Sequence, residues 1–239
     1  MIYCMFEQSG TFKNAFKKLG YDAIDLDILN DFNQTDTIID LFAEINHAYN
    51  EESSIFDKIT ENDLIIAFFP CIRFENQILI NFRGQNYGMK NWSIEKKILN
   101  CMRLQTELTE MYLLINKLFL ICMKKKLKLI VENPYSEEHY LRRYWCYPPS
   151  IIDKDRRTGG DYYKKPTQYW FVNFEPKNNL VMGSYNNAID CKDPIKKIKK
   201  EHAEMMGAKS VRVARSMIHP QYAENFIKKY ILEQKSEAN

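Results

Sequence analysis

Asp63-Leu-Ile-Ile-Ala-Phe-Phe-Pro-Cys71 is the stretch that decides the fold, because its apolar run stops on a proline and a cysteine. A second run, Leu127-Lys-Leu-Ile-Val131, stops on Glu132-Asn133-Pro134. Both have the length and the branched side chains of buried strands. Open α/β sheets place their chemistry just beyond the carboxyl ends of the strands. We therefore expect Cys71, Glu132 and Asn133 to meet at one sheet edge, where a thiol, a carboxylate and an amide suit covalent attack on a polar ring.

The rest of the chain alternates between strand and helix patterns. Residues 1–6, 22–27 and 167–174 predict further strands, and helical spacing appears over 12–19, 36–46, 94–123, 194–206 and 219–233. Ser9 is the expected N-cap of the first helix. This alternation predicts an α/β fold with a mostly parallel, doubly wound sheet. We expect one domain over 1–239, with 135–166 as a loop insertion and 234–239 as a disordered tail.

The composition narrows the class of protein. Hydrophobic residues make up 45% of the 239 residues and charged residues 27%, as in ordinary soluble domains. The net charge of +3 is too small to imply nucleic-acid binding by itself. The six cysteines contain no C-x-x-C pair, which argues against a zinc site, and no apolar run approaches the ~20 residues of a membrane helix. We expect a cytoplasmic protein without a membrane segment or a metal.

The first strand, turn and helix form a candidate nucleotide site. A glycine-containing turn before a helix N-terminus lets backbone approach a ligand, and here that glycine is Gly10. Asp27 ends the second strand, where a carboxylate can accept hydrogen bonds from ribose hydroxyls. Only one glycine is present, so a purely structural turn is the alternative.

The segment 135–166 mixes basic and aromatic residues. Tyr144 and Trp145 can stack on bases, and the neighbouring basic side chains can contact phosphates. A solvated loop with one or two aromatic rings in the core is the alternative. The basic candidates for nucleic-acid contact are Arg142, Arg143, Arg156, Arg157, Lys164 and Lys165.

Several short motifs follow one another along nearly the whole chain. They are Phe6-Glu-Gln-Ser-Gly-Thr11, Pro70-Cys71, Glu132-Asn133, Lys165-Pro-Thr-Gln-Tyr-Trp170 and Arg215-Ser-Met-Ile-His-Pro220. In this order they resemble the cytosine-5 DNA methyltransferases, in particular the short phage-like and prophage-like members without a separate target-recognition domain.

The resemblance implies a Rossmann-like methyltransferase fold and S-adenosylmethionine as cofactor, with S-adenosylhomocysteine as product. It implies that the Cys71 thiolate adds to carbon six of a flipped or unpaired cytosine in DNA, and that Glu132 and Asn133 hold the base. A partly exposed loop at a strand end permits a lowered thiol pKa for Cys71. The cofactor-binding residues implied are Phe6, Gln8, Ser9, Gly10, Thr11, Asp27, Asp40 and Pro70.

Departures from the family pattern keep two other functions open. Gln8 stands where the family has its first glycine, and the chain has no room for a separate recognition domain, which a separate protein can supply. The first alternative is a non-catalytic descendant that binds nucleic acid or protein. The second is an amino-methyltransferase that uses Asn133-Pro134-Tyr135 to hold an exocyclic amine.

Overall fold

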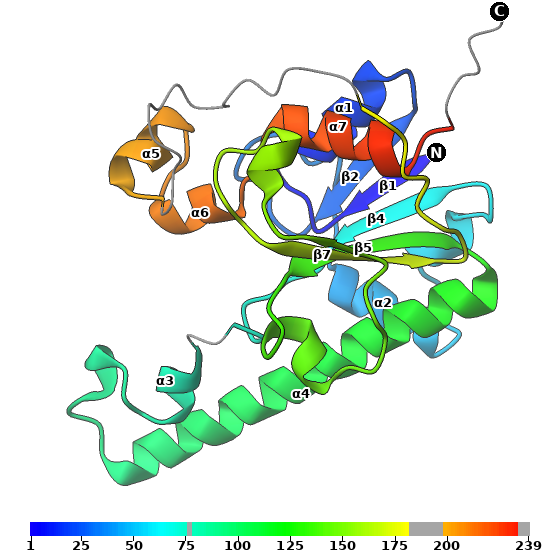
Figure 1. Ribbon diagram of the computed structural model, residues 1–239. Helices are drawn as coiled ribbons and strands as arrows, with labels where there is room; N and C mark the ends of the chain where they lie inside the picture. The colour runs from blue at the N-terminus through cyan, green and yellow to red at the C-terminus, as the bar shows by residue number, and fades with distance from the viewer. Residues whose placement is uncertain (76–77, 182–197, 234–239) are drawn as a thin grey trace, which may run out of the picture.

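A seven-stranded sheet is the centre of the protein, as the computed structural model shows over residues 1–75, 78–181 and 198–233 (Figure 1). Its strand order is β3-β2-β1-β4-β5-β7-β6. The strands are β1 (Ile2–Met5), β2 (Ala23–Asp27), β3 (Thr37–Ile38), β4 (Leu64–Phe68), β5 (Lys128–Pro134), β6 (Ile151–Asp153) and β7 (Thr167–Val172). The helices are α1 (Thr11–Lys18), α2 (Leu41–Tyr49), α3 (Leu79–Phe82), α4 (Ile94–Lys125), α5 (Lys200–Met205), α6 (Val211–Ser216) and α7 (Pro220–Tyr230).

The direction of the strands confirms the expected mostly parallel α/β sheet. Strands β1 to β5 pair in parallel, and β7 then lies antiparallel to both β5 and β6. The segment 135–166 is more than the loop expected from the sequence, since it contains the edge strand β6 and the 3₁₀ turns η4 (Tyr140–Tyr144) and η5 (Arg156–Gly159). A three-residue strand is too short to leave a periodic signal.

Alternate residues of the strands build one hydrophobic layer on each face of the sheet. In β4, Ile65 and Ala67 belong to the layer covered by α2 and α4, whereas Leu64 and Ile66 belong to the layer covered by α1 and α7 (Figure 1). Successive side chains of a strand point to opposite faces, so the apolar run of β4 is buried on both. Burial on both faces explains why the sequence is continuously apolar from Leu64 to Phe69.

Three helix starts differ from the sequence-based prediction. Helix α5 begins at Lys200, although the prediction 194–206 includes the described residues 198 and 199. The helix expected over 36–46 begins only at Leu41, because Thr37–Ile38 pairs with β2 as β3. The N-cap of α1 is Gly10, with a φ of 66°, and not Ser9. Residues 194–197 of the predicted helix 194–206 and the tail 234–239 lie outside the described residues.

The longest helix, α4, reaches well beyond the sheet. Its 32 residues span about 48 Å at 1.5 Å per residue. The C-terminal half packs under β4 and β5 through Leu114, Ile115 and Leu118, whereas Ile94, Ile98 and Met102 in the first turns are exposed. Among the described helices, none combines the length and the apolarity needed to cross a membrane.

Candidate active site

The carboxyl ends of β1, β2, β4 and β5 bring the predicted motifs to one edge of the sheet. Met5 lies beside Leu26 and Ala67, and Phe68 lies beside Glu132. The turn after β1, Asp27 and the Pro70-Cys71 loop are therefore neighbours. The sheet order reverses between β1 and β4, which is where open α/β sheets hold their ligands.

Asn133 fastens the cysteine loop to the end of β5. Its Nδ2 donates to the carbonyl oxygen of Phe69 over 3.1 Å, and its side chain is fully buried. Strand β5 extends through Pro134, so the side chains of Glu132 and Asn133 leave opposite faces of the strand. Asn133 thus positions the loop, and Glu132 is the residue left to meet a ligand.

Cys71 is held as a thiol in this arrangement. Burial raises the pKa of Cys71 to about 11, Lys165 acts in the opposite direction, and the negative charges of Glu132 and Glu75 raise the pKa further. The Sγ atom donates to Glu75 Oε1 over 3.9 Å. This corrects the expectation of a lowered pKa, because the partly exposed Cys71 packs against the hydrophobic cluster that contains Phe69 and Phe74.

Glu132 faces a buried arginine, Arg156, whose position no sequence pattern predicted. Arg156 Nη1 lies 3.8 Å from Glu132 Oε1, and Nη2 of the same guanidinium pairs with Asp161. Its Cζ stands 4.8 Å from the ring centroid of Tyr222. Arg156 has no exposed surface, so the structure corrects its assignment to phosphate contact. It instead compensates two carboxylates, one of them in the candidate site.

Three buried acceptor oxygens at this edge lack a hydrogen-bond donor among the described residues. They are Glu132 Oε1, Asn133 Oδ1 and, opposite Asn133 in β7, Gln168 Oε1. The Arg156 contact with Glu132 Oε1 is an ion pair at 3.8 Å, too long to be a hydrogen bond. Leaving such an atom unpaired is costly, so a donor supplied by a ligand would be stabilising.

The turn after β1 contains a carboxylate that our sequence analysis missed. Glu7, 6% exposed, accepts from the backbone N–H of Phe12 at 2.8 Å and of Lys13 at 3.3 Å. Burial raises the pKa of Glu7 to about 7, although these two N–H donors favour its charged form. The backbone amides of Phe12 and Lys13, in the first turn of α1, are therefore already hydrogen-bonded. The sequence signal for this role was an acidic residue just before the helix, where negative charge is stabilised.

The remaining residues of the turn are tied to the loop after β2. Gln8 Oε1 accepts from Asp31 N over 3.1 Å, and Ser9 and Thr11 bond to each other through their hydroxyl groups at 2.9 Å. Buried Lys13 lies 3.0 Å from Asp25 and 3.2 Å from Asp36. A Cβ on Gly10 would come within 3.2 Å of Gln34, so the close approach of the two loops requires glycine there.

Asp27 and Asp40 have different surroundings. Asp27 accepts from Leu29 N over 2.8 Å, remains partly exposed, and has its pKa raised by burial. Ile28 and Leu29 after it are exposed apolar side chains. Asp40 caps α2 by accepting from Phe42 N and Ala43 N, which gives it a structural role.

Asp27, Ile28 and Leu29 have the chemistry that a nucleoside site requires. A half-exposed carboxylate beside apolar side chains can take a ribose and a flat aromatic base. Phe6 adds a ring 5.6 Å from Phe69 and 5.8 Å from Phe42. Because Glu7 fills the helix N-terminus, the turn does not offer the free amides that a pyrophosphate needs. The donor set therefore suits a cofactor that has a nucleoside but no phosphate.

The basic residues of the loop 135–166 differ in their exposure and in their ion pairs. Arg142, Arg143 and Lys164 are exposed, but Arg157 forms a two-point pair with Asp155, at 2.8 and 2.5 Å. Trp145 packs on Phe119 and Trp170 in the core. A cleft of about 490 Å³ beside the loop has mixed charge, since it is lined by Glu137 and Glu138 as well as by Lys154 and Lys164.

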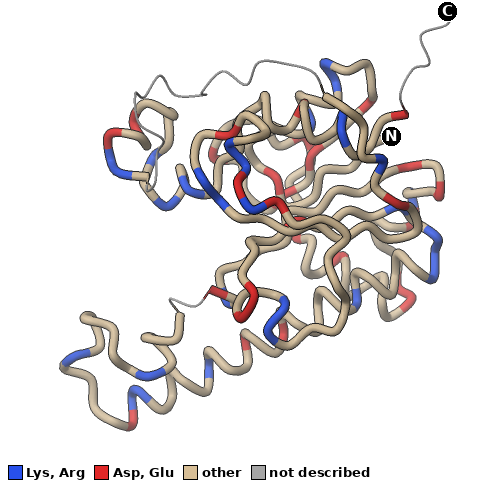
Figure 2. Tube along the Cα trace, viewed as in Figure 1, with Lys and Arg blue, Asp and Glu red and all other residues tan. Residues whose placement is uncertain are grey.

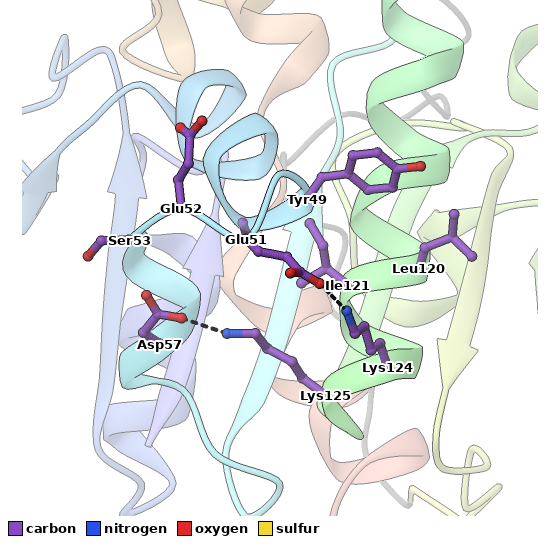
Figure 3. Close-up of a pocket in the computed structure, with 10 residues that line it drawn as sticks. Tyr49, Glu51, Glu52, Ser53, Asp57, Leu120, Ile121, Lys124 and Lys125 are labelled. Atoms are coloured by element: carbon purple, nitrogen blue, oxygen red, sulfur yellow. Dashed lines mark hydrogen bonds and ion pairs between the residues drawn. The ribbon is translucent and has the colours of Figure 1, made fainter.

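A second cleft, of about 540 Å³, lies at the opposite edge of the sheet, between the end of α2 and the end of α4 (Figure 3). There Lys124 pairs with Glu51 at 2.7 Å and Lys125 with Asp57 at 2.6 Å. Helix α4 ends where β5 begins, so this cleft is remote from Cys71 and Glu132.

Neither similarity to known proteins nor a metal centre assigns a function to this site. No family model matches the chain, and no curated protein matches it. In the described part of the chain, no three His, Cys, Asp or Glu side chains come together as a metal site requires. The assignment of function therefore depends on the geometry at the sheet edge.

Proposed function

We propose that the protein transfers a methyl group from S-adenosylmethionine to carbon five of cytosine in DNA, through a covalent adduct at Cys71. The observation that carries the proposal is the 3.1 Å hydrogen bond from Asn133 Nδ2 to Phe69 O. This bond fixes the cysteine loop against the strand that bears Glu132. It gives a nucleophile and a base-reading carboxylate on adjacent strand ends, as a reaction on a polar ring requires.

Glu132 is the residue proposed to hold the base. Cytosine presents an exocyclic amino group, and a carboxylate is the side chain that accepts from it. The buried Oε1 atom of Glu132 lacks such a donor among the described residues. Arg156, at 3.8 Å, keeps the carboxylate in place and offsets its charge. A base must leave the stack to reach this buried edge.

Cys71 is proposed to open the reaction. Its proton passes to Glu75, whose Oε1 lies 3.9 Å from Sγ, and the sulfur then bonds to carbon six while the electron pair moves to carbon five. S-adenosylmethionine, when bound, supplies the methyl group as a sulfonium. A water molecule from solvent then takes the proton on carbon five. The electron pair of that bond re-forms the double bond between carbons five and six as the bond from sulfur to carbon six breaks, and the released thiolate takes its proton back from Glu75.

A non-catalytic binding module is the second candidate, favoured by the raised pKa of Cys71. The amino-methyltransferase alternative has less support, because Asn133 is fully buried and its amide donates to Phe69 O. In that position it serves the cysteine loop and does not present an amine to a methyl donor.

Transfer of a labelled methyl group from S-adenosylmethionine to cytosine-containing DNA tests the proposal. We expect incorporation with the wild-type protein and none with Cys71→Ala, while Asp27→Ala weakens cofactor binding measured by calorimetry. An amino-methyltransferase would remain active as Cys71→Ala. Undetectable cofactor binding at millimolar concentration, together with DNA binding, would favour the non-catalytic module instead.

A further inference from the structure

The segment 78–104 forms an arm that projects beyond the sheet. It comprises α3, the 3₁₀ turn η3 (Tyr87–Met89) and the first turns of α4 (Figure 1). The arm follows the Cys71 loop in the chain and extends on the side of the carboxyl end of β5, since α4 leads back to the opposite end of that strand. It therefore lies on the same side of the sheet as the candidate active site.

Side-chain bonds give the arm a fixed shape. Asn86 Nδ2 donates to Asn81 Oδ1 over 2.8 Å, and Asn100 on α4 donates to the carbonyl oxygen of Asn81 over 3.4 Å. Gly84 has a φ of 62°, and a Cβ there would come within 2.8 Å of the Lys97 side chain. The hairpin that carries η3 is thus packed closely on α4.

The arm carries more net positive charge than the whole protein. It contains five basic residues and one acidic residue, Glu95, for a net charge of +4 against +3 for the chain (Figure 2). Arg103 pairs with Glu107. Arg83, Lys90 and Lys96 are exposed, and no carboxylate of the described residues lies within ion-pair distance of them. Such a surplus of unpaired cations favours a polyanionic partner.

Aromatic rings accompany these cations. Tyr87, the first residue of η3, is 90% exposed, although Asn86 Oδ1 fixes its turn by accepting from Gly88 N over 3.0 Å. Lys96 Nζ lies 4.4 Å from the ring centroid of Trp92. An ordered backbone that holds an aromatic ring in solvent, on the same arm as exposed cations, is suited to base stacking with phosphate contacts alongside.

We propose that the arm 78–104 binds the DNA that presents the target base to Cys71, with Tyr87 stacking on a base and Arg83, Lys90 and Lys96 contacting phosphates. The inference rests on the proposed function and assigns the recognition surface of that site. The loop 135–166 also exposes Arg142, Arg143 and Lys164, but its cleft includes the carboxylates of Glu137 and Glu138, whereas the arm has only one acidic residue.

A protein partner is the competing occupant, because Ile94, Ile98 and Met102 on α4 are exposed apolar residues. The surplus of charge and the exposure of Tyr87 favour DNA over such a partner. The two occupants predict different responses to substitution, so one set of variants separates them.

Fluorescence anisotropy with labelled mixed-sequence DNA, duplex and single-stranded, over a range of salt concentrations, tests the arm. For duplex DNA, Arg83→Ala combined with Lys90→Ala should reduce the slope of log affinity against log salt by about 1.8, at roughly 0.9 per phosphate contact. Tyr87→Ala should weaken single-strand binding roughly five- to 150-fold, as expected for loss of one stacked base. Matched controls remote from the arm, Lys58→Ala and Tyr49→Ala, should leave both values unchanged.

Unchanged affinity and slope in the arm variants would overturn the inference. So would tighter binding of a matched RNA through the same residues, or a dimer in sedimentation that Ile98→Asp disrupts without loss of DNA binding. Arm-dependent DNA binding without methyl transfer would contradict the proposed function and leave this inference standing.

Discussion

The two ends of the candidate site treat their polar groups in opposite ways. In the turn after β1, Glu7 accepts from the first amides of α1, and Gln8 accepts from Asp31 N. At the ends of β4 and β5, Glu132 Oε1 and Asn133 Oδ1 are buried without a donor among the described residues. The side-chain oxygens of Glu7 and Gln8 thus have backbone donors, whereas Glu132 Oε1 and Asn133 Oδ1 have none among the described residues.

This difference means that the two ends contribute differently to the stability of the fold and to the affinity for a ligand. Buried acceptors without partners lower stability and are the groups from which a ligand gains most. A turn that is already satisfied must exchange existing bonds when a ligand enters, so its affinity is reduced by the bonds it breaks. Substitutions at each end can therefore separate stability from binding.

The largest expected effect concerns Arg156, which compensates Glu132 and Asp161. Arg156→Met should lower the free energy of unfolding by about 3–5 kcal/mol, because two buried carboxylates lose their cation. Urea unfolding measures this change. Arg157→Met is the matched control, and its partly exposed pair with Asp155 should contribute about 1 kcal/mol or less. An equal loss in both variants would contradict the role given to Arg156.

Glu7 should make stability depend on pH. Its pKa is raised from 4.5 to about 7 in the folded state, so its contribution is fully present below pH 4.5 and is lost as the pH rises through 7. At 1.36 kcal/mol per unit, the wild type should lose roughly 3 kcal/mol relative to Glu7→Gln between pH 4.5 and 8. Urea unfolding at several pH values measures this difference, and a constant difference would show that Glu7 is ionised throughout.

Asn133→Ala should detach the cysteine loop from β5. Loss of the donor leaves Phe69 O buried and unpaired, at a cost of about 1–3 kcal/mol. Asn46→Ala removes a similar but exposed amide-to-carbonyl bond, to Phe42 O, and should cost less. Thermal unfolding compares the two, and methyl transfer should fall in Asn133→Ala at temperatures where the variant is folded. Full activity in the folded variant would show that the bond does not position Cys71.

The smallest effect is expected for Gln8→Gly, which removes the bond to Asp31 N. A bond of about 0.5–1.5 kcal/mol no longer has to be exchanged, so affinity for S-adenosylmethionine should rise about two- to tenfold. Calorimetric titration measures the affinity, with Gln85→Gly in the arm as control. Weaker binding by Gln8→Gly would mean that the Gln8 side chain itself contacts the cofactor.

The parts of the fold that were predicted from the sequence are those with local periodicity. The apolar runs before Cys71 and Glu132 give β4 and β5, and their shared edge follows from the parallel sheet. Arg156 could not be placed, because its burial depends on Glu132 and Asp161 from separate segments. Strand β3 was missed because two residues carry no periodic pattern. Ser9 was wrongly predicted as the N-cap of α1 because the side chain that accepts from the first turn is Glu7, five residues before Phe12 and outside the usual capping position.

Capture of the covalent adduct tests the central claim most directly. The protein is incubated with S-adenosylmethionine and DNA that contains 5-fluorocytosine, in which fluorine replaces the proton that must leave carbon five. We predict a stable protein–DNA adduct whose mass includes the transferred methyl group and whose modified peptide contains Cys71, with no adduct for Cys71→Ala. Methyl transfer without any adduct, or an adduct at another cysteine, would contradict the account.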